Sequence, residues 1–174
     1  NYFKRMKQHS IWDSKNTVAW DSSIEGAKEI NSLCIANPDV YYFSITNYKT
    51  EIDEDSGYHK PMKGMSNILK VQARLMGRKK AYYSDGASTD STWYLNDGVV
   101  NTVSMFGPTT GSSGADPITE FRQGDLVIPG QWYVMGNYEL DHSALIGHQM
   151  KKYEYSSLKK IYLDQLKILW SLPN

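Results

Sequence analysis

The sequence predicts an α/β fold with a mostly parallel sheet and flanking helices. Residues 24–34 carry apolar side chains at helical spacing, and residues 40–46 follow as a run of β-branched and aromatic residues with few charges. A helix followed by a buried strand is the unit from which parallel sheets are built. A second strand, rich in aromatic residues, is predicted at 131–138, and an amphipathic helix is predicted at 156–169.

The first helix has recognisable start and stop signals. Ser22 and Glu25 have the spacing of a capping box, in which each side chain bonds the backbone N–H of the other residue. Pro38 cannot continue a helix and therefore ends it. The apolar side of the helix consists of Ile24, Ala27, Ile30 and Cys34. Because Cys34 is the single cysteine, an internal disulfide and a cysteine-rich zinc site are excluded, and a buried inert thiol is expected.

Residues 47–64 are polar and acidic, with glycine and proline as breakers, and this composition predicts a long surface loop. The acids in this segment lack the spacing of an EF-hand calcium loop. They are therefore interpreted as solvated charges.

Two further helices and two further loops complete the predicted organisation. A helix over 66–76 is expected to end at Gly77, and loops are expected over 84–92 and 107–125. The apolar face of the 66–76 helix is expected to consist of Ile68, Val71 and Leu75. The face of the last helix is expected to consist of Leu158, Ile161, Tyr162, Leu166 and Leu169.

Composition excludes several classes of protein. The 174 residues carry 19 Lys and Arg against 19 Asp and Glu, so the net charge is zero and the broad basic surface of a nucleic-acid binder is missing. The sequence contains no apolar run long enough to span a membrane, and residues 1–7 are not followed by the apolar core of a signal peptide. The length suits one domain or a part of one.

Two segments carry residues that could perform chemistry. Asp97 lies in an Asn-Asp-Gly turn after an apolar stretch, and His142 follows the predicted strand at 131–138. An Asp presented from a turn can orient a His through its Nδ1–H, as the acid of a Ser-His-Asp triad does. The order of acid and then His is that of an α/β-hydrolase. Taken alone, Asn-Asp-Gly is also an ordinary turn sequence, so the short motif leaves both interpretations open.

Longer strings resemble one family. Residues 96–108 (NDGVVNTVSMFGP) resemble the catalytic-acid segment of the secreted lipases of Gram-positive bacteria, and residues 132–142 (WYVMGNYELDH) resemble their catalytic-His segment. These are the staphylococcal and Geobacillus-type true lipases of the α/β-hydrolase superfamily. Segments at 12–17, 20–21, 26–31 and 38–44 follow the same family in the same order. The whole chain is therefore similar to the C-terminal part of such a lipase, with an α/β-hydrolase fold whose N-terminal half is absent.

This resemblance implies a serine carboxylester hydrolase, similar to the triacylglycerol lipases, in which Asp97 is the triad acid and His142 the general base. The family places its nucleophile in Gly-x-Ser-x-Gly within the N-terminal half. The string at 111–115 (GSSGA) ends in Ala and follows no strand, so it is rejected as that motif. Residues 1–174 are thus expected to be one partial domain that is inactive alone, is poorly soluble and needs its N-terminal half. The resemblance also implies an extracellular enzyme acting on lipid or other esters at an interface.

The family resemblance also concerns metals, although no cofactor is required for the chemistry. These lipases hold a structural calcium through the backbone carbonyl that matches Gly64 and through acids that follow the catalytic His. Those acids are replaced here by Ala144 and Gln149, so a weak or vestigial calcium site is expected at Gly64. The zinc-binding Asp of the family matches Asn16, a poor zinc ligand, so zinc binding is not expected; Asp13 and Asp21 lie nearby but are not assigned as substitutes.

Two other functions remain open at this level. One is a non-catalytic binding module that uses its many Tyr and Trp side chains. The other is one half of a naturally split hydrolase. The DNA upstream of the coding sequence discriminates among the three, because only the truncated lipase predicts an in-frame Gly-x-Ser-x-Gly motif there.

Overall fold

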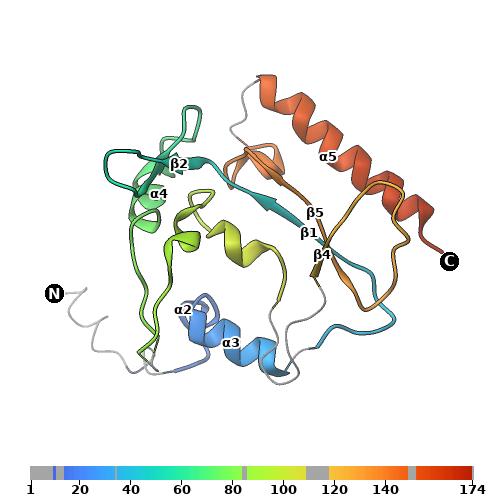
Figure 1. The fold of residues 1–174 in the computed structure, drawn as a ribbon, viewed down its shortest axis with the longest axis horizontal. Coiled ribbons are helices and arrows are strands. Elements are labelled where there is room, and N and C mark those ends of the chain that lie inside the picture. The colour runs from blue at the N-terminus through green and yellow to red at the C-terminus, as the bar shows by residue number, and fades with distance from the viewer. Residues whose placement is uncertain are drawn as a thin grey trace.

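The computed structural model describes Ser10 and residues 14–33, 35–83, 86–108, 118–148 and 152–173. At its centre lies a three-stranded sheet in the order β1 (Tyr42–Asn47), β5 (Trp132–Tyr138), β4 (Ile118–Glu120). Both pairings are parallel, and helices flank the sheet (Figure 1). The predicted α/β fold with a parallel sheet is confirmed, as are the strands over 40–46 and 131–138.

The register of β1 against β5 determines where functional segments meet. Tyr42 pairs with Trp132 at one end and Asn47 with Tyr138 at the other. The Tyr42 and Trp132 rings stack with centroids 4.7 Å apart. Because parallel strands point the same way, the segments that follow Asn47 and Tyr138 leave the sheet side by side, at the C-terminal ends of β1 and β5.

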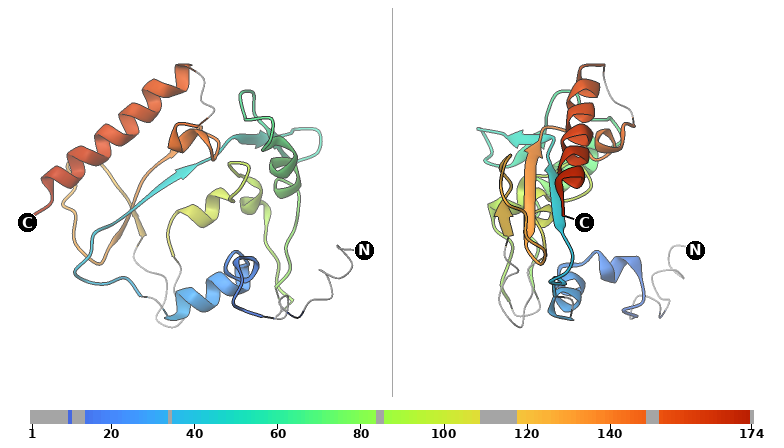
Figure 2. Two further views of the ribbon diagram at one scale, coloured as in Figure 1. Left: turned by 180° about the vertical axis from the view of Figure 1, so that it is seen from behind. Right: turned by 90° about the vertical axis from the view of Figure 1, so that its right-hand side faces the viewer.

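Helix α5 (Lys152–Ser171) packs along one face of the sheet (Figure 2). Its Ile161 belongs to a buried cluster with Leu140 and Ala144, against which Ile45 of β1 and Tyr138 of β5 also pack. The predicted face of this helix was only partly right. The buried residues are Leu158, Ile161 and Ile168, whereas Tyr162, Leu166 and Leu169 are 46%, 60% and 59% exposed.

The helix predicted over 24–34 exists as α3 (Ile24–Leu33), which follows the short α2 (Val18–Asp21). Its cap is displaced by one residue, because Ser23 and not Ser22 accepts the bond from Gly26 N–H, at 3.0 Å. Ser22 is instead occupied as the C-cap of α2, where its N–H donates to Val18. The expectation of a buried Cys34 thiol falls outside the described residues.

The predicted surface loop at 47–64 was wrong in its first and last parts. An antiparallel hairpin of β2 (Thr50–Ile52) and β3 (His59–Pro61) occupies it. Thr50 is 1% exposed, because its hydroxyl donates to the Asn96 carbonyl at 3.2 Å and accepts from Asn96 N–H at 3.0 Å. These partners are distant in sequence, so the polar composition gave no sign of burial.

Helix α4 (Lys70–Met76) ends at Gly77 as predicted but begins four residues later than expected. Its predicted apolar face does not pack against the described part of the chain. Ile68, Val71 and Leu75 are 78%, 68% and 51% exposed, whereas Ala73 is completely buried.

The remaining elements are short. Short 3₁₀ turns cover Ser91–Tyr94 (η2), Thr102–Met105 (η3) and Ala144–Ile146 (η4). Strand β4 falls within the loop predicted at 107–125, so that loop is interrupted; its remaining described residues belong to no helix or strand. Within the described ranges, no helix combines the length and the apolar character that crossing a membrane demands.

The true packing face of α5 can be tested by a pair of substitutions. Ile161→Ala should lower the free energy of unfolding by about 2–5 kcal/mol, because it removes buried methyl groups and leaves a cavity. The matched control Leu166→Ala, on the exposed side, should change it by about 0.5 kcal/mol or less. Urea unfolding of both variants of residues 1–174 alone, in which Leu166 is exposed, measures the difference, and equal losses would contradict the orientation described above.

Candidate active site

The turn that carries Asp97 is built by buried backbone and amide bonds. Asn96 is fully buried; its Nδ2 donates to the carbonyls of Ala73 and Tyr94, and its Oδ1 accepts from Gly98 N–H at 2.9 Å. Gly98 has φ +100°, and a Cβ there would lie 2.8 Å from the Leu69 Cβ. Both the backbone conformation and the close contact therefore require glycine.

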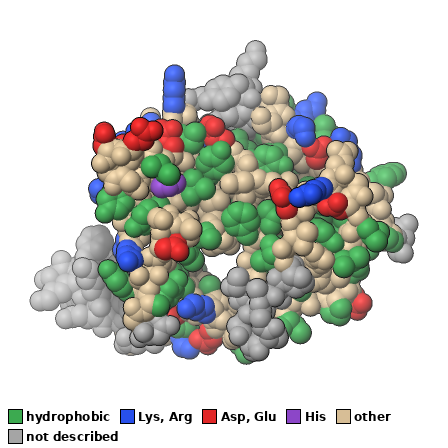
Figure 3. All heavy atoms as spheres, in the orientation of Figure 1, with side chains coloured by type: hydrophobic (Ala, Val, Ile, Leu, Met, Phe, Trp, Pro, Cys, Tyr) green, Lys and Arg blue, Asp and Glu red, His purple; other side chains and the backbone are tan. Residues whose placement is uncertain are grey.

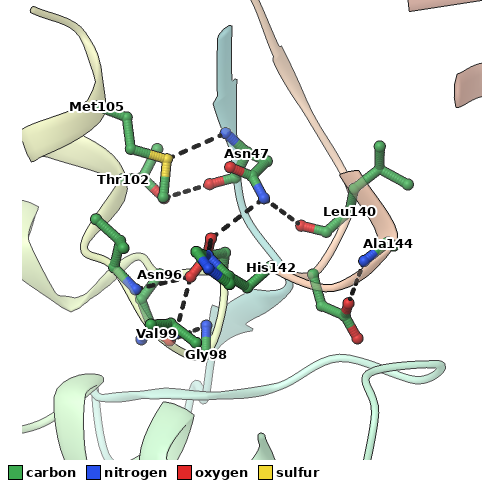
Figure 4. A network of polar contacts seen from close by, with 12 residues as sticks. Asn47, Asn96, Gly98, Val99, Thr102, Met105, Leu140, His142 and Ala144 are labelled. Carbon is green, nitrogen blue, oxygen red and sulfur yellow. Dashed lines mark hydrogen bonds and ion pairs between the residues drawn. The ribbon is translucent and has the colours of Figure 1, made fainter. Parts of the chain in front are cut away.

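The Asp97 carboxylate is 1% exposed and is surrounded by N–H donors. Its Oδ1 accepts from the backbone N–H groups of Val99 and Val100, at 2.8 and 2.7 Å. Its Oδ2 accepts from His142 Nδ1 at 2.9 Å and from Asn47 Nδ2 at 3.2 Å (Figure 4). These bonds compensate the charge of a carboxylate that has almost no contact with water.

The structure brings the two predicted site residues together. His142 is bonded to Asp97 twice, since its backbone N–H also donates to the Asp97 carbonyl at 3.1 Å. A carboxylate only accepts, so its partner Nδ1 carries the hydrogen of a neutral ring, and Nε2 is then left with a free lone pair. The side chain is 49% exposed. The arrangement can therefore accept a proton at Nε2 and stabilise the resulting imidazolium.

Asp141, the residue before His142, is a site residue that sequence reasoning missed. It is 6% exposed, and its Oδ2 accepts from Ser66 N–H at 2.8 Å while its Oδ1 accepts from Ala144 N–H at 2.9 Å. One carboxylate thus joins the segment beside Gly64 to the segment that bears His142. Its position beside the predicted base was the one available signal.

Among the described positions that the family resemblance assigns to calcium, Ala144 offers no side-chain oxygen to a calcium ion. Gly64 has φ +101° and lies two residues before Ser66. Ala144 is 3% exposed and contributes only a methyl group to the cluster with Leu140 and Ile161. Gln149 lies outside the described residues. A site with so few oxygen ligands is unsuited to a cation that takes six to eight.

No zinc ligands are brought together by the part of the chain that the structure describes. Asn16 and Asp21 are both exposed, and Asp13 and the rejected string at 111–115 lie outside that part. Across the same residues, no group of three or more His, Cys, Asp or Glu side chains is placed to hold a metal.

A partly buried ion pair joins Lys49 to Glu139, whose side chain is 51% exposed. Lys49 has a side chain that is 2% exposed, and its Nζ contacts Glu139 Oε1 at 3.0 Å and the Glu139 carbonyl at 3.4 Å. It therefore ties the segment between β1 and β2 to the segment between β5 and His142. Sequence reasoning missed Lys49 because it lay in the predicted surface loop.

A mainly apolar cavity of about 540 Å³ lies on the other side of the acid turn. It is bordered by the start of α3, by Trp93 and by Val99–Asn101, and it does not reach Asp97 or His142. Figure 3 shows this face hollowed below its centre. The cavity is therefore lined by residues of the turn that carries Asp97, but neither Asp97 nor His142 faces it.

The fold and the site define the class of protein: an α/β protein in which a buried Asp in a turn is paired with a His that follows a strand of the parallel sheet. Within that class, the chain belongs to the family described as the lipase-like, C-terminal domain, whose sequence model matches residues 1–165. The predicted resemblance to the staphylococcal lipases is confirmed, and family membership favours a hydrolase over an aromatic-rich binding module.

Individual relatives agree with this assignment. The lipase of Staphylococcus hyicus is 28% identical over 161 residues, which are 91% of this chain and 23% of that protein. Lipase 2 of Staphylococcus aureus is 26% identical over 109 residues, covering 63% of this chain and 14% of the relative. The chain therefore spans about a quarter or less of the length of these relatives.

Solved structures show the same relationship. EstA from Clostridium botulinum superposes with a TM-score of 0.74 at 36% identity, over 90% of this chain and 38% of EstA. The Staphylococcus hyicus lipase structure gives a TM-score of 0.68 at 26% identity, over 98% of this chain and 43% of the lipase. In both, more than half of the relative lies outside the superposed region.

The tether made by Asp141 can be tested by an isosteric change. Asp141→Asn replaces one acceptor oxygen by an NH₂ group that faces a backbone N–H, so it should lower the free energy of unfolding by about 1–3 kcal/mol. The control Asp90→Asn changes an exposed N-cap whose Oδ1 accepts from Thr92 N–H, and it should be nearly neutral because Asn caps as well as Asp. Thermal unfolding compares the two, and an Asp141→Asn variant as stable as the parent would contradict the tether.

Proposed function

We propose that this chain supplies the acid and the base of a serine carboxylester hydrolase of the lipase type. The observation that carries the proposal is the bond from His142 Nδ1 to the buried Asp97 Oδ2, at 2.9 Å. That bond selects the imidazole tautomer that a serine nucleophile needs. Membership of the lipase-like family and the similarity to staphylococcal lipases support the same reaction class.

In the proposed reaction, a serine hydroxyl attacks the carbonyl carbon of an acyl ester. His142 Nε2 takes the proton from that hydroxyl and then gives it to the alcohol that leaves as the C–O bond breaks. A water molecule, deprotonated by the same Nε2, then attacks the acyl-enzyme; the bond from the acyl carbon to the serine oxygen breaks, the carboxylic acid leaves, and Nε2 returns the proton to the serine. Asp97 stays a carboxylate throughout and stabilises the imidazolium that forms between the two transfers.

The serine and the oxyanion-hole donors are proposed to belong to an N-terminal portion that joins or accompanies this chain. The relatives support this, because most of each relative lies outside the region that matches the chain. We use "intact enzyme" for this chain joined to that portion. Its proposed substrates are lipid or other esters at an interface, and its proposed location is extracellular, both on the strength of the lipase similarity.

We further propose that this part of the enzyme needs no calcium. Asp141 already joins the Ser66 and Ala144 segments, which are the two segments that the family resemblance assigns to the metal. The hydrogen bonds of a buried carboxylate therefore serve the purpose of a bridging ion here.

The proposed chemistry predicts a specific pattern of activity loss. In the intact enzyme, Asp97→Asn and His142→Ala should each lower kcat for a p-nitrophenyl ester by at least about 10³-fold, because the base loses its tautomer or is removed. His148→Ala, an exposed histidine six residues further on, is the matched control and should remain near wild type. This chain alone should show no turnover, and retained activity in the Asp97 or His142 variants would refute the proposed roles.

Calcium independence predicts an unchanged melting temperature. A ligand that binds only the folded state raises the apparent stability by about 2.7 kcal/mol at 100 times its Kd. Thermal unfolding in excess EDTA and in millimolar CaCl₂, with MgCl₂ at equal ionic strength as the control, should therefore give the same Tm. A rise in Tm that saturates with calcium and not with magnesium would overturn the proposal.

A further inference from the structure

Asn47 occupies an unusual place for a buried amide, at the last residue of β1 and between the two site segments. Its side chain is 3% exposed. The backbone around it is fixed, since its carbonyl accepts from Thr102 Oγ1 at 2.9 Å and its N–H faces Met105 Sδ at 3.5 Å. The amide group projects from this strand end toward Leu140 and His142 (Figure 4), and its Nδ2 lies 3.2 Å from Asp97 Oδ2.

Both described partners of Asn47 Nδ2 are acceptors. It donates to Asp97 Oδ2 at 3.2 Å and to the Leu140 carbonyl at 3.3 Å. If the amide were turned over, its oxygen would face two other oxygens, so the chemistry of the partners settles the orientation. Asn47 thus bridges the acid turn and the segment that leads, two residues later, to His142.

Asn47 binds Asp97 Oδ2, the same carboxylate oxygen that binds His142 Nδ1. The backbone bonds from Val99 and Val100 hold Oδ1, but they do not fix how Oδ2 is shared. Asn47 binds Oδ2 itself, beside His142 Nδ1, and it holds Leu140 at the same time. It therefore restrains both ends of the acid–imidazole bond to one strand of the sheet.

We propose that Asn47 is a positioning residue, which holds Asp97 Oδ2 and the His142-bearing segment together so that the imidazole keeps its productive tautomer and direction. This inference rests on the proposed roles of Asp97 and His142. Asn47 touches no substrate, so its removal should lower kcat and leave KM nearly unchanged.

The test compares three variants in the intact enzyme. Asn47→Ala removes both bonds, and Asn47→Asp keeps the shape while it replaces the donor with a second carboxylate oxygen beside Oδ2. Thr46→Val is the matched control: Thr46 is the neighbouring residue of β1, it is fully buried, and its hydroxyl donates to the Gly136 carbonyl at 3.0 Å, away from the site. It removes a buried bond of the same strand without touching Asp97.

We expect Asn47→Ala to lower kcat for the p-nitrophenyl ester by about 10–100-fold, with KM within about twofold, as is typical when an outer-shell orienting group is lost. Asn47→Asp should lower kcat at least as much, because like charges then face each other. Thr46→Val should lower the melting temperature without lowering kcat at temperatures where it stays folded.

The outcomes separate this inference from the proposed function. Wild-type kcat in Asn47→Asp, or an equal loss of kcat in Thr46→Val, would overturn the positioning role of Asn47. If Asn47→Ala fails to fold, Asn47→Asp still decides the question because it is isosteric. Retained activity in Asp97→Asn and His142→Ala, measured beside these variants, would instead show that the proposed function itself had failed.

Discussion

The buried carboxylate of Asp97 is the constraint on which the rest of the site depends. A carboxylate that is 1% exposed is stable only where donors compensate its charge. Those donors come from the acid turn itself, from Asn47 at the end of β1 and from His142 after β5. Because these donors belong to three separate segments, the hydrogen bonds that compensate the carboxylate charge also hold the three segments of the site together.

The parallel pairing of β1 with β5 brings those segments within reach of one another. Asn47 lies opposite Tyr138 at the edge where both strands end, so the chain leaving β5 passes beside the acid turn within a few residues. Ile161 of α5 then packs on Ile45, Tyr138 and Leu140 and holds this edge from one face of the sheet. The position of His142 therefore follows from strand pairing and helix packing as well as from its own hydrogen bonds.

The sequence predicted those features whose signals are local. The strands at 40–46 and 131–138 were recognisable from composition, whereas Asp97 and His142 were singled out by the longer strings at 96–108 and 132–142 that resemble the lipase family. Asn47 could not be recognised, because its role depends on a carboxylate 50 residues away. The same holds for Asp141, whose partner Ser66 is 75 residues distant. The polar composition of residues 47–64 predicted that Thr50 lies on the surface. Thr50 is in fact buried, and its hydroxyl donates to the Asn96 carbonyl.

The predicted apolar faces of α4 and α5 were wrong or only partly right for a different physical reason. Periodicity shows which residues of a helix are apolar, but not which of them this chain itself covers. Val71 and Leu75 of α4 and Leu166 of α5 remain exposed, and we expect the portion that carries the serine to cover such positions. The Asp97–His142 bond, by contrast, uses contacts made entirely within this chain. Asp97 and His142 are thus oriented by one part of the fold, and in the proposed enzyme only the nucleophile has to be brought to them.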